Sequence, residues 1–291
     1  MSSNNTVTSA VLVKVATGMI GKTLTDRQIT GEIRAAKLMQ GDDTGRWIKN
    51  KWGKTALKAM TSCLSESYSY HREHTIPWDD WGYGLVRADM LDAYRAGMAQ
   101  ITEKFRAAVE EFVSALPQII EDRRAALGQS FDLGDYPTAD EMRRECSITM
   151  TVAPVPTVDD FSRYAFAQGT LAAVKADHES RLAGIEVTAK IEPYKRVLPL
   201  LEKIVATLSA PDKIFRDSLV GNVKEALDVI PFLSLNGDAE LTALVESVRM
   251  KVAAIDPQLL RDSAAQRERM VEMARDLAAK FSGAVNRKLQ K

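Results

Sequence analysis

The chain has 291 residues, of which 45% are hydrophobic and 27% charged, so it can bury a sizeable core as one large domain or two modest ones. Lysine plus arginine equals aspartate plus glutamate at 39 each, and this zero net charge excludes a globally basic nucleic-acid-coating protein. No apolar run is long enough to cross a membrane, and no signal-peptide layout opens the chain. We therefore expect a cytoplasmic protein without membrane contact.

Two elements are expected near the N-terminus. β-branched residues alternate with small or polar ones over Ala10–Ala16, which predicts a half-buried strand. The sequence Thr25-Asp-Arg-Gln28 has the pattern of a capping box, in which the threonine and glutamine side chains bind free backbone N–H groups. It predicts a helix from there to about Met39.

The segment Arg46–Tyr70 is expected to be the next helix. Its first half is basic, contains two tryptophans and lacks acidic residues, and positions 47, 51, 54 and 58 would share one helical face. Charge beside an aromatic platform is typical of single-stranded nucleic-acid contact. The other interpretation is a solvated basic face whose tryptophans pack inward. The candidate nucleic-acid contacts are Arg46, Trp47, Lys49, Lys51, Trp52, Lys54 and Lys58.

The aromatic-rich segment Tyr68–Gly84 is expected to be a structured loop that packs against the long helix after it. It holds two of the three histidines beside acidic residues, but a metal or acid–base site needs groups from a second element, and no second cluster is found. A binding loop is the other interpretation, because exposed aromatics in loops often serve recognition. The candidate interaction residues are Tyr70, His71, His74, Trp78, Trp81 and Tyr83.

The segment Ala88–Leu116 predicts a long amphipathic helix. Its apolar residues recur at alternating steps of three and four, so the helix must pack against a partner helix in this chain or in a second copy. We expect Pro117 to kink or restart the helix and Gly128 to end it. The apolar stripe consists of Leu91, Tyr94, Met98, Ile101, Phe105, Ala108, Phe112 and Ala115.

A second alternating stretch, Ser147–Ala153, follows a short helix that a capping box at Thr138–Glu141 predicts. Because a single strand cannot form a sheet, we expect this stretch to pair with the strand near 10–16. Beyond Pro156 the pattern is helical to the end of the chain. The expected fold is mainly α, with long amphipathic helices and a small two-stranded sheet. An α+β part with the long central helix spans 1–156, and an all-helical part spans 157–291.

The sequence contains no motif of an enzyme. It lacks a phosphate-binding loop, a nucleophile elbow, paired zinc ligands and a dinucleotide fingerprint. Adjacent carboxylates such as Asp79 and Asp80 point apart on a regular element and are more typical of caps and turns. We therefore expect no cofactor, no metal and no catalytic residues.

Several segments carry a resemblance to other proteins. They are Tyr70-His-Arg-Glu-His-Thr-Ile-Pro-Trp-Asp-Asp-Trp-Gly, Glu111-Phe-Val-Ser-Ala-Leu-Pro, Asp135-Tyr-Pro-Thr, Ala153-Pro-Val-Pro and Phe215-Arg-Asp-Ser-Leu-Val. With them most of the chain resembles a widespread family of uncharacterised tailed-phage proteins. Genes of that family often lie near those of a MoxR-type ATPase and a von Willebrand A-domain protein. The resemblance implies an adaptor for an ATPase remodelling system, or a role in phage DNA metabolism, in the infected bacterial host.

Three classes of function follow, in order of preference. The first is a non-enzymatic phage protein that acts through protein–protein contacts, including self-association through the long helices, with the MoxR-type ATPase or the von Willebrand A-domain protein as a partner. The second is a single-stranded nucleic-acid-binding protein that uses Arg46–Lys58. The third is an enzyme.

Overall fold

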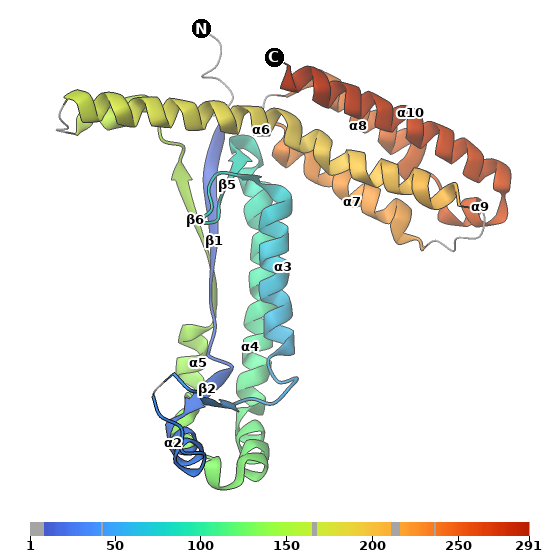
Figure 1. Ribbon diagram of the computed structural model, residues 1–291. Coiled ribbons are helices and arrows are strands. Elements are labelled where there is room, and N and C mark those ends of the chain that lie inside the picture. Colours follow the sequence, from blue (N-terminus) through green and yellow to red (C-terminus); the bar gives the residue numbers. More distant parts are fainter. Residues whose placement is uncertain (1–8, 42, 165–167, 211–215, 236, 291) are drawn as a thin grey trace. The chain divides into compact units, whose positions relative to one another are not determined.

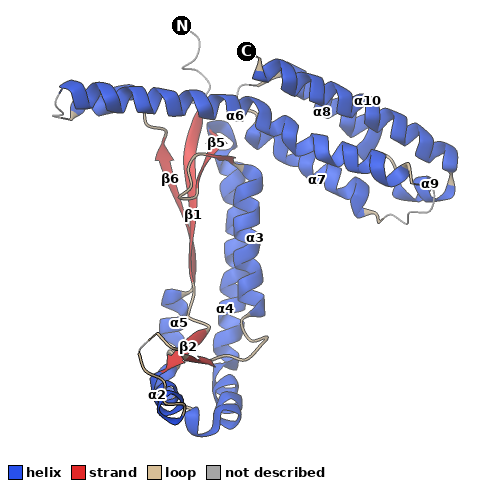
Figure 2. Cartoon of the chain, in the orientation of Figure 1, coloured by secondary structure: helices blue, strands red, loops and turns tan. Residues whose placement is uncertain are grey.

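The computed structural model describes residues 9–41, 43–164, 168–210, 216–235 and 237–290, and most of them are helical (Figures 1 and 2). The mainly α class is confirmed. Phe215, in one of the segments that carry the resemblance, lies outside the described residues.

The chain forms two compact units. The first contains the described residues of Met1–Lys14, His71–Tyr94 and Thr151–Lys291, and the second contains those of Val15–Tyr70 and Arg95–Met150. Neither unit is one continuous stretch of sequence. The predicted boundary near Pro156 stays a prediction.

The larger sheet has four strands in the order β4-β5-β1-β6. The expected pairing of the two alternating stretches is confirmed, because β1 (Ala10–Gly18) and β6 (Ser147–Pro154) are neighbours. The expected two-stranded sheet was too small, since β4 (Ile76–Pro77) and β5 (Tyr83–Arg87) extend it. β5 runs antiparallel to β1, with Ala10 opposite Arg87 in register.

The two unexpected strands form a hairpin within the aromatic-rich segment that was predicted to be a loop. The Trp78 N–H donates to the Tyr83 carbonyl, and the Asp79 carboxylate accepts from the N–H groups of Trp81 and Tyr83. Gly82 has φ +88, a left-handed conformation that glycine adopts without strain. The carboxylate and the glycine close the turn. Turn residues of this kind are a stronger sequence signal for a hairpin than its two short strands.

The long helix is α4 (Leu91–Leu127), preceded by a 3-10 turn at Ala88–Met90. Pro117 lies inside it without ending it, and Gly128, at φ +52, follows its last residue as expected. The predicted apolar stripe is buried over most of its length. Its buried members are Tyr94, Met98, Ile101, Phe105 and Phe112.

The N-terminal part of the second unit differs from expectation. Asp26, the last residue of strand β2 (Thr23–Asp26), caps α2 (Arg27–Ala36) in place of Thr25, because the Asp26 carboxylate accepts from the Ile29 N–H. β2 pairs with β3 (Trp47–Asn50), so the helix predicted from Arg46 is wrong in its first part. The tryptophan and isoleucine of β3 have high strand propensity, and pairing with β2 overrides the helical spacing of the lysines.

The helix that does form here, α3 (Lys58–His74), packs beside α4 in the second unit. Lys104 of α4 forms an ion pair with Glu66 of α3 at 2.8 Å. The absence of a side chain at Gly97 lets the Tyr70 ring approach the α4 backbone. The short helix α5 (Ala139–Glu145) begins with the predicted capping box of Thr138 and Glu141.

The C-terminal helices bury the largest core. Tyr194, Val197 and Leu201 of α6 pack with Phe281 of α10 in this core. α6 continues through Gly184 without a break, and a capping box of Thr157 and Asp160 opens a 3-10 helix, Val158–Arg163, before it. The helices are α6 (Gln168–Leu208), α7 (Ser218–Leu233), α8 (Ala239–Val248), α9 (Pro257–Asp262) and α10 (Ala264–Leu289).

The hairpin makes a testable prediction about stability. A Cβ at Gly84 would lie 2.5 Å from the Cβ of Thr75, which is 3% exposed and short, so it cannot swing away. Gly84→Ala should lower the free energy of unfolding by about 1–3 kcal/mol in urea denaturation. The matched change Gly184→Ala, in an exposed helical position with free space around it, should raise it by up to about 1 kcal/mol. Equal effects at the two positions would contradict the packing of the hairpin.

Candidate functional site

The predicted nucleic-acid face does not exist as a helical face. Trp47 and Lys49 lie on β3, the next residues form a turn, and only Lys58 is helical. The Lys49 side chain is buried at 5% exposure, and Trp52 is buried at 2%. Arg46, Lys54 and Lys58 are exposed, and Lys51 is half-buried. The structure therefore divides the seven predicted contacts between the interior and the surface.

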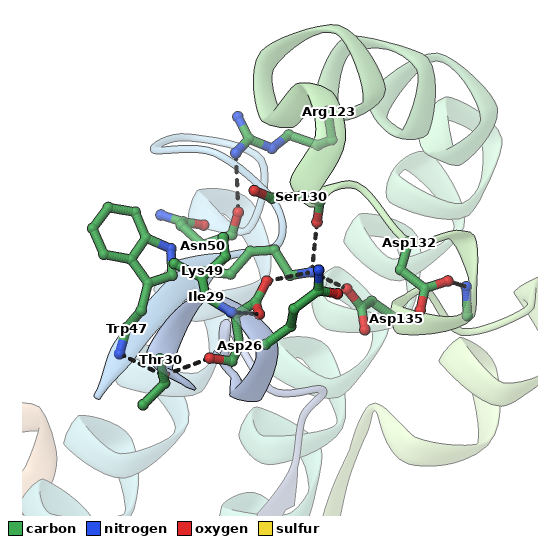
Figure 3. Close-up of polar contacts among 12 residues, drawn as sticks. Asp26, Ile29, Thr30, Trp47, Lys49, Asn50, Arg123, Ser130, Asp132 and Asp135 are labelled. Carbon is green, nitrogen blue, oxygen red and sulfur yellow. Dashed lines mark hydrogen bonds and ion pairs between the residues drawn. The ribbon is translucent and has the colours of Figure 1, made fainter. Parts of the chain in front are cut away.

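Lys49 is the centre of a buried ion cluster (Figure 3). Its Nζ lies 2.6 Å from an Asp135 carboxylate oxygen and 3.6 Å from one of Asp26, and it donates to the Ser130 carbonyl at 2.8 Å. Ser130 is 81 residues further along the chain. The cluster therefore ties the two-stranded sheet to the connection between α4 and α5.

The electrostatics of the cluster keep Lys49 charged. Burial works to lower the pKa of Lys49, but the hydrogen bond and charge of Asp135, followed by those of Asp26, outweigh it and raise that pKa above its usual value. A lysine that stays protonated at neutral pH cannot serve as a nucleophile or a general base. The arrangement is therefore suited to holding chain segments together rather than to chemistry.

Neighbouring hydrogen bonds extend the cluster to α2 and α4. The second Asp26 oxygen accepts from the Ile29 N–H at 2.9 Å, which caps α2. The Thr30 hydroxyl donates to the Asp26 carbonyl and accepts from the Trp47 N–H. Arg123 of α4 donates to the Asn50 carbonyl at 3.0 Å. Both ends of β3 are thus attached to helices as well as to β2.

Trp52 is a core residue. Its ring makes edge-on contacts with Phe112 and Tyr136, each with ring centroids 5.3 Å apart, and its indole N–H donates to the Gly21 carbonyl. The Lys51 ammonium lies 5.3 Å from the Trp52 ring centroid, and burial lowers the pKa of Lys51. With these contacts Trp52 cannot stack a nucleic-acid base.

The same part of the chain exposes apolar side chains. The described residues include fifteen exposed large hydrophobic side chains, and six of them belong to this region. They lie on β2, on β3, on α2 and just after the end of α2. They fall within residues 24–48, on two paired strands and the helix between them, with the neighbours Trp47 and Ile48 on opposite faces of β3. We call this set the apolar surface, and it consists of Leu24, Ile33, Leu38, Met39, Trp47 and Ile48.

The predicted interaction loop is mostly engaged within its own unit. His71 places Nδ1 2.7 Å from the Tyr94 hydroxyl and Nε2 3.1 Å from the Gly82 carbonyl, and burial lowers the pKa of His71. The lowered pKa favours a neutral ring, which donates from Nε2 to the carbonyl and accepts at Nδ1 from the tyrosine hydroxyl. Trp78 is buried beneath the Arg181 guanidinium.

The other members of that loop vary in exposure. His74 makes an edge-on contact with Phe232, and the half-buried Tyr83 lies beneath the Lys14 ammonium. Tyr70 is half-buried, and burial raises the pKa of its hydroxyl. Trp81 alone of the six candidates is largely exposed, at 80%. The segment is therefore a packed hairpin with one tryptophan at its tip.

The described residues also bear on metal sites and membrane spans. No three or more His, Cys, Asp or Glu side chains in this part of the chain are grouped so that they could hold a metal ion. None of the described helices is both long and apolar enough to span a membrane.

Comparison with known proteins found no relative. No protein-family model matches the chain, no curated protein matches it, and no solved structure matches its fold.

The ion cluster makes a testable prediction about stability. Lys49→Met leaves the carboxylates of Asp135 and Asp26, which are only 14% and 11% exposed, without their cation, so the free energy of unfolding should fall by about 3 kcal/mol in urea denaturation. The matched change Lys51→Met removes a half-buried lysine that forms no ion pair with a described residue. It should lower the free energy of unfolding by less than about 1 kcal/mol. Adding Asp135→Asn to Lys49→Met should recover part of the loss. Equal losses at the two lysines would contradict the cluster's role.

Proposed function

We propose that the protein is not an enzyme and acts through contacts with other proteins, with the apolar surface of Leu24, Ile33, Leu38, Met39, Trp47 and Ile48 as the contact site. The observation that carries the proposal is the gathering of these exposed side chains on two short strands and one helix. Exposed apolar clusters of this kind mark interaction sites, because water contact with them is unfavourable.

The Lys49 cluster supports this proposal in a second way. It attaches β2 and β3 to the connection after α4, so the apolar side chains are presented on an anchored support. Preorganised contact residues lose less conformational entropy on binding. The buried charges of Lys49, Asp26 and Asp135 satisfy one another, which favours a structural role over a catalytic one.

The first partner we propose is a second copy of the chain. The apolar surface lies on a two-stranded sheet in which β2 and β3 pair only with each other, so each strand has an edge free of strand pairing among the described residues. Such edges favour further association. The finer proposal, from the resemblance to tailed-phage proteins, is an adaptor that joins a MoxR-type ATPase or a von Willebrand A-domain protein in an infected bacterium.

Single-stranded nucleic-acid binding is the alternative function. The exposed cations Arg46, Lys54 and Lys58 favour it, because they remain accessible to phosphates. The burial of Lys49 and Trp52 weighs against it, since one cation and one of the two tryptophans of the predicted motif are lost to the interior. We rank it second for that reason.

Sedimentation velocity over a wide concentration series tests the proposed contact. The wild type should self-associate, and Trp47→Ser combined with Ile48→Ser should weaken association at least tenfold, because about 1.4 kcal/mol of apolar burial is lost. A control that combines Trp81→Ser with Val187→Ser removes two exposed apolar side chains elsewhere and should associate like the wild type. A wild type that stays monomeric, or a control as weak as the Trp47 variant, would contradict the proposal.

A further inference from the structure

A groove of about 810 Å³ opens on the second unit, between the segment 52–62 and α4. Its floor is apolar, with Trp52 and Phe112 buried beneath it and Met60 closing one side. Small side chains, Ala108 and Ala115 among them, leave the space unfilled. The groove shares no residue with the apolar surface.

The α4 side of the groove has the spacing of a helix-packing seam. Ala108, Phe112, Ala115 and Ile119 line it at steps of four, three and four. From Ala108 to Arg123 the lining spans about 22 Å of helix at 1.5 Å per residue, or about four turns. Ala115 is exposed and Ile119 is half-exposed, so this seam has no helix packed over it among the described residues. Its length and spacing match one side of a helix pair.

The two walls of the groove carry opposite charges. Lys54 and Lys58 lie on the wall formed by 52–62, and Glu111 and Asp122 lie on the α4 wall. Neither lysine forms an ion pair with a described residue. Arg123, also on the α4 wall, is held by its hydrogen bond to the Asn50 carbonyl. The exposed charges are therefore positive on the wall formed by 52–62 and negative on the α4 wall, where Arg123 is the less exposed charge.

We propose that this groove binds an amphipathic helix of a protein partner, acidic on the flank that faces Lys54 and Lys58 and basic on the flank that faces Glu111 and Asp122. The apolar floor takes the apolar face of that helix, as in other helix-in-groove complexes. Charges on both flanks then fix its orientation, as they do in paired helices. This inference rests on the proposed role in protein contact, but it names a different surface and the chemistry of its partner.

The charge pattern favours a helix over a nucleic acid. A strand of phosphates along the groove would face Glu111 and Asp122 on one side, where like charges repel it. The buried Trp52 offers no face for base stacking. A peptide that carries both signs of charge meets attraction on both walls.

The test is a fluorescence-anisotropy titration with two labelled helical peptides of about 15 residues. Both carry a leucine stripe; the first has glutamates on one flank and lysines on the other, and the second has lysines on both flanks. The wild type should bind the first about tenfold more tightly. Lys54→Glu combined with Lys58→Glu makes both walls acidic and should reverse this preference.

A second pair of variants tests the place of binding. Ala115→Trp fills the groove and should abolish binding, whereas Ala107→Trp, at an exposed position of the same helix outside the groove, should leave it unchanged. Circular dichroism checks that both variants keep their helices. Trp47→Ser with Ile48→Ser should also leave peptide binding unchanged, which separates this inference from the proposed function.

Three results of the peptide titrations would overturn the inference. They are the absence of saturable binding of either peptide, an order of affinity that the lysine reversal does not change, and equal binding by Ala115→Trp and the wild type. Displacement of the bound peptide by an unlabelled single-stranded oligonucleotide would also overturn it, and would assign the groove to nucleic acid.

Discussion

The ammonium group of Lys49 lies in the interior, where a charge is tolerated only with compensating partners. Asp26 and Asp135 provide the charge, and the Ser130 carbonyl provides a further acceptor. Two short strands could not hold their place by pairing alone, because an isolated hairpin is marginally stable in water. The position of β2 and β3 in the second unit therefore depends on this cluster, and so does the surface that they expose.

Two features of the second unit follow from that arrangement. Lys49 of β3 and Trp52 of the following turn are buried. Trp47 and Ile48, also on β3, remain exposed. The chain then turns at Gly53, whose φ of +79 suits glycine, and Lys54 and Lys58 reach the wall of the groove beside α4. One basic segment thus contributes to an interior cluster, an apolar surface and a polarised groove.

Much of the fold could be predicted because its signals are local. The heptad-like spacing predicted α4, alternation predicted β1 and β6, and the box at Thr138 predicted α5. Strand β3 could not be predicted in this way, because the lysine spacing after Trp47 also fits a helix. Only pairing with β2 decides between strand and helix here. Lys49 and Asp135 meet through folding of distant segments, so no local pattern marks either as half of an ion pair. Exposure of Ile48 is likewise a tertiary property.

Hydrogen–deuterium exchange on the wild type and on Lys49→Met tests most directly whether the ion cluster holds this region in place. Loss of the cation should speed exchange of the backbone amides of β2 and β3, because local opening no longer breaks a buried ion pair. Exchange in the C-terminal helices α7 and α10, which have their own core, should stay unchanged. Equal exchange of β2 and β3 in the two proteins would contradict the dependence of these strands on Lys49.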